Sequence, residues 1–169
     1  MQIEAAITSA LAFERRIRDL YVEAVDRTDD AAGKKIFQAL GDDEQRHVDY
    51  LKSRLDEWRR QGKLNEEVLA SAVPDRDAIR RTAAGLQSKL DEDSRGLKQE
   101  MLSKALALEI ETSQFYRQLV ETVSSDHRPM FARFLEIEDN HVEMVQFELD
   151  HLTRTGFWFG FEEFDMEGI

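Results

Sequence analysis

Residues 37–58 read FQALGDDEQRHVDYLKSRLDEW, and this stretch decides the fold. Its apolar residues follow the alternating steps of three and four that mark one face of an α-helix. That stripe is made of Phe37, Leu40, Leu51, Leu55 and Trp58. Glu44 and His47 lie in the middle of the same stripe, side by side because they are three positions apart. A carboxylate and an imidazole on a face that packs inward need polar partners inside the protein.

Three further stretches have the same helical spacing, and each carries a glutamate on its apolar stripe. We expect helices at residues 2–26, 31–60, 97–124 and 128–153. Gly62 suits the end of the second helix, and Pro129 suits the first turn of the fourth. Residues 62–98 contain Pro74 and predict a long crossover with one or two short helices, one of them capped by Asp75 or Asp77.

The second half of the chain repeats the polar positions of the first. Glu14, Tyr21, Glu44 and His47 recur at nearly constant offset as Glu109, Tyr116, Glu138 and His141. A duplicated two-helix unit explains this recurrence. Short turns within each unit and a long crossover between them are the connectivity of ferritin-like bundles. The sequence therefore predicts an all-α, ferritin-like four-helix bundle, with residues 1–169 as one domain.

The four stripe glutamates indicate a metal site. Burying one ionised carboxylate costs several kcal/mol, and four close together repel one another strongly. Lysine and arginine are missing from these stripes, whereas two divalent cations would supply a balancing charge of about +4. We predict that two metal ions are bound by Glu14, Glu44, His47, Glu109, Glu138 and His141. Such ligands suit iron or manganese, and zinc could also occupy the site.

Other polar and aromatic residues lack this pattern or allow two interpretations. His127 and His151 lie outside the stripes, and we do not expect them to bind metal. Tyr21 and Tyr116 are either core tyrosines or hydrogen-bond donors that orient a ligating carboxylate. The aromatic tail GFWFGF at residues 156–161 either packs over the bundle or a neighbouring subunit, or restricts access to the metals.

Composition excludes several classes of protein. The net charge of −12 argues against nucleic-acid binding, which needs a basic surface. The absence of cysteine excludes disulfides, thiolate zinc sites and iron–sulfur centres. Neither a signal peptide nor an apolar run near the ~20 residues of a membrane span is present, so we expect a cytoplasmic protein.

Four motifs together resemble the rubrerythrin branch of the ferritin-like superfamily, over nearly the whole chain. The motifs are Glu14…Tyr21, Glu44-x-x-His47, Glu109…Tyr116 and Glu138-x-x-His141. The resemblance implies that Glu44 and Glu138 bridge two iron ions. It also implies that Glu14 and Glu109 are terminal ligands, with one histidine completing each iron.

The chain departs from that family in two respects. Many rubrerythrins carry a further glutamate one turn beyond the ligand of the third helix, where this chain has Thr112, and Glu111 points off the stripe. The site is therefore closer to the six-ligand kind of bacterioferritins. We expect no rubredoxin domain, so electrons would come from a separate donor such as a rubredoxin-like protein.

We expect a dimetal oxidoreductase that reduces hydrogen peroxide or dioxygen in oxidative-stress defence, as a homodimer. One alternative is a ferroxidase that stores iron in a cage. The residues after 153 show no stripe for the fifth helix usual in such cages, which favours the oxidoreductase. A second alternative is a bundle that binds metal without catalysis.

Overall fold

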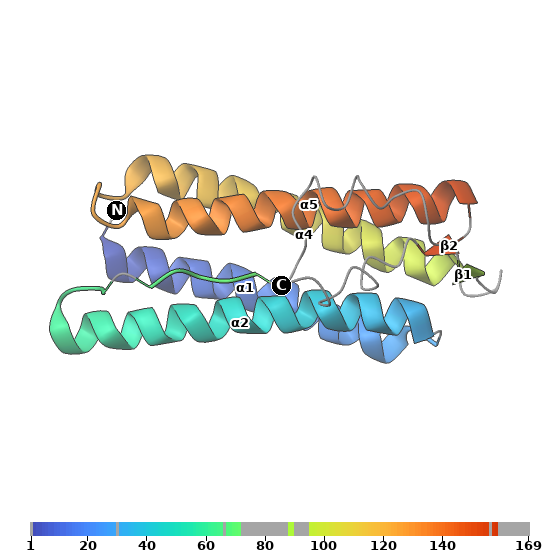
Figure 1. Ribbon diagram of the computed structural model, residues 1–169, viewed down its shortest axis with the longest axis horizontal. Coiled ribbons are helices and arrows are strands. Elements are labelled where there is room, and N and C mark those ends of the chain that lie inside the picture. The colour runs from blue at the N-terminus through green and yellow to red at the C-terminus, as the bar shows by residue number, and fades with distance from the viewer. Residues whose placement is uncertain are drawn as a thin grey trace, which may run out of the picture.

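The structure is a computed structural model that describes residues 2–29, 31–65, 67–71, 88–89, 95–155 and 157–158. Four long helices run along the molecule (Figure 1). They are α1 (Ile3–Arg27), α2 (Ala31–Gln61), α4 (Arg95–Thr122) and α5 (Arg128–Thr155). Every helix end lies within two residues of its predicted position. The prediction of an all-α four-helix bundle is confirmed.

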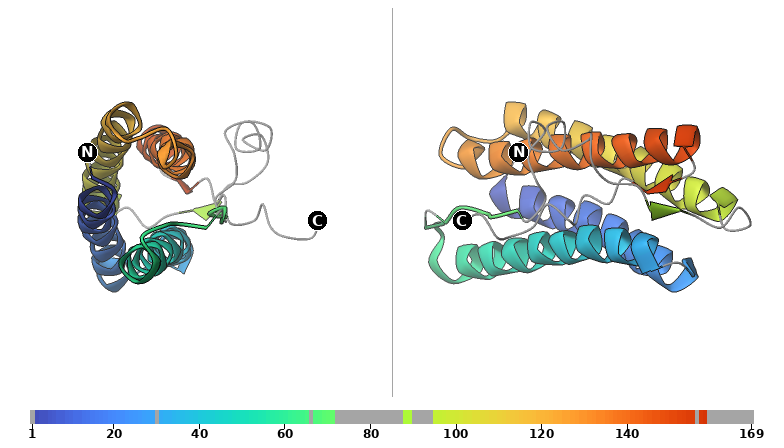
Figure 2. Two further views of the ribbon diagram at one scale, coloured as in Figure 1. Left: turned by 90° about the vertical axis from the view of Figure 1, so that its left-hand side faces the viewer. Right: turned by 45° about the vertical axis from the view of Figure 1, so that its right-hand side comes forward.

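The helices pack as two pairs. α1 packs against α2 and α4 against α5, while contacts between α1 and α4 join the pairs. Viewed along the bundle, the helices follow the order α2, α1, α4, α5, and residues 67–71 lie on the side between α2 and α5 (Figure 2). α2 and α5 are the two helices that carry the Glu-x-x-His pairs, so this side is next to both histidines.

Local sequence explains where α2 ends. Gly62 follows the helix with φ at 65°, the left-handed conformation in which glycine costs least. Its amide donates a hydrogen bond to the carbonyl oxygen of Trp58 at 2.8 Å, which closes the last turn. The predicted role of Gly62 is confirmed.

The apolar stripes form two buried clusters separated along the bundle. One cluster is built around residues such as Phe37, Met101 and Val145, and the other around residues such as Leu51 and Phe131. On each helix, the stretch between its two clusters is the one that carries the stripe glutamate. A polar layer therefore lies inside the bundle with apolar packing on both sides.

The crossover and the tail meet in a short ladder. β1 (Ser88–Lys89) pairs antiparallel with β2 (Phe157–Trp158), with Ser88 opposite Trp158. The sequence did not predict this pairing. The sequence predicted short helices in the crossover, one of them capped by Asp75 or Asp77. That cap and the remainder of the aromatic tail lie outside the described residues. Within the described residues, no helix has the length and apolar character needed to cross a membrane.

Candidate metal centre

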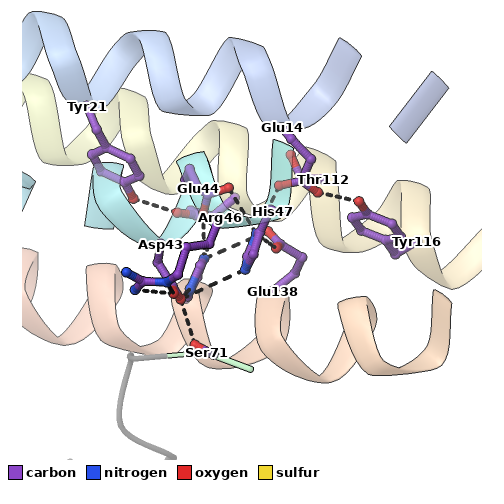
Figure 3. A network of polar contacts seen from close by, with 12 residues as sticks. Glu14, Tyr21, Asp43, Glu44, Arg46, His47, Ser71, Thr112, Tyr116 and Glu138 are labelled. Carbon is purple, nitrogen blue, oxygen red and sulfur yellow. Dashed lines mark hydrogen bonds and ion pairs between the residues drawn. The ribbon is translucent and has the colours of Figure 1, made fainter. Parts of the chain in front are cut away.

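The six residues predicted to bind metal meet in the polar layer. α1 contributes Glu14, α4 contributes Glu109, and α2 and α5 each contribute a glutamate and a histidine, and all six side chains are 0% exposed. Figure 3 shows Glu14, Glu44, His47 and Glu138 converging from three helices. The structure thus brings together residues that lie far apart in the sequence, as the shared stripes require.

The first group surrounds the imidazole of His47. Its Nδ1 lies 3.0 Å from Glu14 Oε2 and 3.2 Å from Glu44 Oε2. Glu138 Oε1 is 3.4 Å from the same nitrogen. Three carboxylate oxygens and one nitrogen therefore converge on one point, close enough together to hold a single ion.

The second group surrounds His141 in the same way. Its Nδ1 lies 2.8 Å from Glu44 Oε1, 3.7 Å from Glu109 Oε2 and 4.0 Å from Glu138 Oε2. These four atoms form a second potential metal site. The two imidazole rings stack nearly parallel, with centroids 5.5 Å apart, so the two groups are neighbours.

Glu44 and Glu138 belong to both groups, whereas Glu14 and Glu109 belong to one each. One oxygen of Glu44 faces His47 and the other faces His141, and the two oxygens of Glu138 divide in the same way. A carboxylate that offers one oxygen to each of two adjacent sites is suited to bridge two ions. The residues that recur in the two halves of the sequence therefore form two nearly symmetric sites.

No family model, curated protein or solved structure matches this chain. The case for metal binding therefore depends on the site itself. Among the described residues, neither oxygen of Glu44 or Glu138 accepts a hydrogen bond, and Glu109 Oε2 also lacks one. Buried oxygens without hydrogen bonds are costly unless something positive binds them. These oxygens lie where the two groups converge, so the residues fit a pair of metal ions.

The pKa values of the buried glutamates also indicate that the site needs positive charge. Burial raises the pKa of the Glu14 carboxyl to about 8, and the charge of Glu44 adds to the rise. Burial also raises the pKa of Glu138 well above its usual range. The pKa of Glu109 rises for the same reason, although His141 opposes it. Glu14 and Glu138 therefore favour a bound proton when no cation is near, and the pKa of Glu109 is shifted in the same direction.

The remaining members of the cluster carry charge. Burial alone would lower the pKa of both imidazoles, but the surrounding carboxylates raise the pKa of His47 and His141 well above the ordinary value. Burial alone would raise the pKa of Glu44, but the two imidazoles lower the pKa well below its usual range. Without metal, protons supply the positive charge that two cations would otherwise bring.

Asp43 is a buried member of this site that the sequence analysis missed. Its Oδ2 lies 3.1 Å from His141 Nε2 and 3.9 Å from His47 Nε2. It therefore faces the ring nitrogens that point away from the glutamates (Figure 3). A ligating histidine commonly donates its second N–H to a carboxylate, which fixes the tautomer and the ring orientation. Asp43 is placed to do this for His141, whereas His47 Nε2 lies beyond hydrogen-bond distance and has no hydrogen-bond partner among the described residues.

Asp43, His47 and His141 also lie close enough to form a third group of potential ligands. The aspartate already has partners, however. Arg46 Nη2 donates to Asp43 Oδ1 at 2.6 Å, and Ser71 Oγ donates to Oδ2 at 2.6 Å. A metal there would also compete for the nitrogens that should carry protons, so we interpret this group as a hydrogen-bond network.

The two tyrosines donate to the terminal carboxylates in a crossed pattern. Tyr21 of α1 donates its hydroxyl proton to Glu109 Oε1 on α4 at 2.5 Å. Tyr116 of α4 donates to Glu14 Oε1 on α1 through a short hydrogen bond (Figure 3). Both tyrosines are fully buried, so they are core residues and also have the contact that an orienting role requires. Their part in any reaction stays a prediction.

The departures noted in the sequence are visible in the site. Thr112 is buried, but its hydroxyl donates to the carbonyl oxygen of Leu108 at 2.9 Å and adds no carboxylate. Glu111 points outward and pairs with Arg16 at 3.0 Å. His127 and His151 belong to none of the potential metal groups among the described residues.

Proposed function

We propose that this protein binds two metal ions between its helix pairs and acts as a rubrerythrin-like diiron oxidoreductase. The observation that carries the proposal is the sharing of Glu44 and Glu138 between two adjacent four-atom groups. Glu14 and Glu109 would each complete one end, as would His47 and His141. Iron is the metal we propose because carboxylate-rich ligation with two imidazoles suits it, and manganese and zinc are the alternatives.

The proposed reaction is the reduction of hydrogen peroxide to water. Two ferrous ions would supply two electrons, so that one peroxide and two protons yield two waters and two ferric ions. Electrons for the next cycle would come from a separate donor such as a rubredoxin-like protein. Dioxygen is a second possible oxidant, and a homodimer is the assembly we propose.

The chain itself would position the ligands and exclude water. Tyr21 and Tyr116 hold one oxygen of each terminal glutamate, which leaves the other oxygen directed at the histidine of that group. Asp43 holds the imidazole of His141 from the opposite side. The two apolar clusters flank the polar layer and lower its dielectric, which strengthens every charge interaction inside it.

Ferroxidase activity is the second candidate, and Thr112 is the observation that favours it. The buried hydroxyl of Thr112 stands where many rubrerythrins have an additional glutamate, so the ligand set is closer to the six-residue set of bacterioferritins. Native mass separates the two candidates. A dimer favours the peroxidase, and a 24-subunit shell favours iron storage.

The test is anaerobic loading with two ferrous ions per chain, followed by hydrogen peroxide. We expect one peroxide consumed for every two irons oxidised, and repeated consumption when a reductant is supplied. The Glu44→Ala, Glu138→Ala double variant should lose this activity, whereas Glu111→Ala, which removes an exposed carboxylate, should retain it. Oxidation that does not recur with reductant would favour a metal-binding bundle without catalysis.

A further inference from the structure

Residues 67–71 form a covering segment over the side of the bundle between α2 and α5 (Figure 2). Tyr50 of α2 donates its hydroxyl proton to the carbonyl oxygen of Glu67 at 2.7 Å. Arg133 of α5 donates to the carbonyl oxygen of Leu69 at 3.1 Å. The Leu69 side chain is 6% exposed and belongs to one of the two core clusters. The covering segment is therefore fixed to both helices that carry the histidines.

This anchoring brings Ser71 onto the carboxylate behind the imidazoles. Ser71 Oγ donates to Asp43 Oδ2 at 2.6 Å, and that oxygen is the one 3.1 Å from His141 Nε2 (Figure 3). The other oxygen of Asp43 is held by Arg46, whose side chain is 47% exposed. Arg46 thus binds one oxygen of the carboxylate, while Ser71 holds Oδ2 next to the ring of His141.

The orientation of each ring matters for metal binding. A neutral imidazole has two tautomers, and a ring flip gives two orientations of each. Only an imidazole with Nδ1 unprotonated and turned toward the glutamates can act as a ligand in this site. That state requires an acceptor for the proton on Nε2, and Asp43 Oδ2 is placed to accept it from His141. A shift of this oxygen would remove the acceptor and allow the unproductive tautomer.

We propose that Ser71 is a positioning residue of the metal centre, which fixes Asp43 and through it the tautomer of His141. The inference rests on the proposed metal-binding function. It gives the crossover a role in that site that no sequence motif indicates. The hydroxyl of Ser71 acts through Asp43 and does not touch the ligand atoms.

The test uses the full chain loaded with zinc, which is diamagnetic and permits NMR of the histidine nitrogens. In Ser71→Ala we expect zinc affinity to fall roughly three- to tenfold, less than the ten- to hundredfold typical of a direct partner of a ligating histidine. The proton on His141 Nε2 should exchange faster with water. Ser71→Thr keeps a hydroxyl and should restore both properties.

Two measurements separate positioning from general destabilisation. Ser103→Ala removes a hydroxyl that donates, among the described residues, to an exposed backbone carbonyl of α4, so it should leave affinity and exchange unchanged. The thermal midpoint of metal-free Ser71→Ala should stay close to that of the wild type. If Ser71→Ala binds two zinc ions with wild-type affinity and its His141 proton exchanges at the wild-type rate, the inference about Ser71 is wrong. The metal site itself would still be supported by the two bound zinc ions. Failure of the wild type to bind zinc would overturn both.

Discussion

Asp43 is the residue whose contacts connect most parts of the site. It accepts from Arg46 and Ser71 and faces the Nε2 atoms of both imidazoles. An amide in its place would present an NH₂ group to at least one donor and lose the negative charge that holds the others. The effect should therefore appear in metal binding before it appears in folding.

We predict that Asp43→Asn weakens metal binding by about ten- to hundredfold, because the imidazole of His141 loses its carboxylate partner. Competition of the protein with a chelator for zinc measures this change. Asp42→Asn is the matched control, since Asp42 is an exposed neighbour that accepts only from Gln38 among the contacts described. Equal affinities for the two variants would contradict the role given to Asp43.

The crossed tyrosines allow the two halves of the site to be tested separately. Tyr116→Phe keeps the ring that stacks on Phe134 at 4.9 Å but removes the hydrogen bond to Glu14, in the group of His47. Tyr21→Phe removes the hydrogen bond to Glu109, in the group of His141. We predict that each change perturbs the NMR signals of its own histidine more strongly in zinc-loaded protein. Equal perturbation of both histidines by either variant would contradict the division into two groups.

The residue scale also shows how far the sequence could lead. The six predicted ligands were identifiable because each lies on the apolar stripe of its helix, where a charged group has no other explanation. Asp43 lies one position off that stripe, and the duplicated position in α5 is Ile137, so the repeat gave no second instance of it. Its spacing of four residues from His47 was the one local signal available.

At the scale of the elements, helix ends follow local rules. α2 ends where Gly62 adopts a positive φ of 65°, a conformation that costs an L-residue about 1–2 kcal/mol. Helix positions were predictable for this reason, since stripes and turn residues are local. The path of residues 67–71 was not, because it depends on donors from two helices, Tyr50 and Arg133, and on the burial of Leu69.

We predict that Gly62→Ala lowers the thermal midpoint by about 2–4 °C for each kcal/mol of strain introduced. A Cβ at this position meets nothing within 4 Å, so any loss reports backbone conformation and not collision. Gly96→Ala is the control, because Gly96 lies inside α4 in equally open space and alanine favours helix there. Equal thermal midpoints for the two variants would contradict the role given to the positive φ of residue 62.

At the scale of the whole molecule, the buried charges link stability to pH. In the metal-free protein, burial raises the pKa of Glu14 from 4.5 to about 8. The folded state therefore binds more protons than the unfolded state between these values, and stability falls as pH rises through this window. The raised pKa values of His47 and His141 act in the same direction above pH 6.5.

We predict that chelator-treated protein has a lower thermal midpoint at about pH 8 than near pH 5, with a smaller change in metal-loaded protein, where cations replace the protons. Circular dichroism at each pH measures both forms. The Glu44→Ala, Glu138→Ala double variant should have a flatter dependence, because it carries fewer buried acids. A midpoint of the metal-free wild type that rises over this range would contradict the proposed electrostatics.

Metal content measures the central claim most directly. Four buried glutamates and two histidines form two groups that share Glu44 and Glu138, and among the described residues no lysine or arginine belongs to either group. Elemental analysis of protein incubated with ferrous iron and then desalted should find two metal ions per chain in the wild type. The Glu44→Ala, Glu138→Ala variant should fold and retain almost none. A folded wild-type protein with no retained metal, or a variant that retains as much as the wild type, would contradict the account.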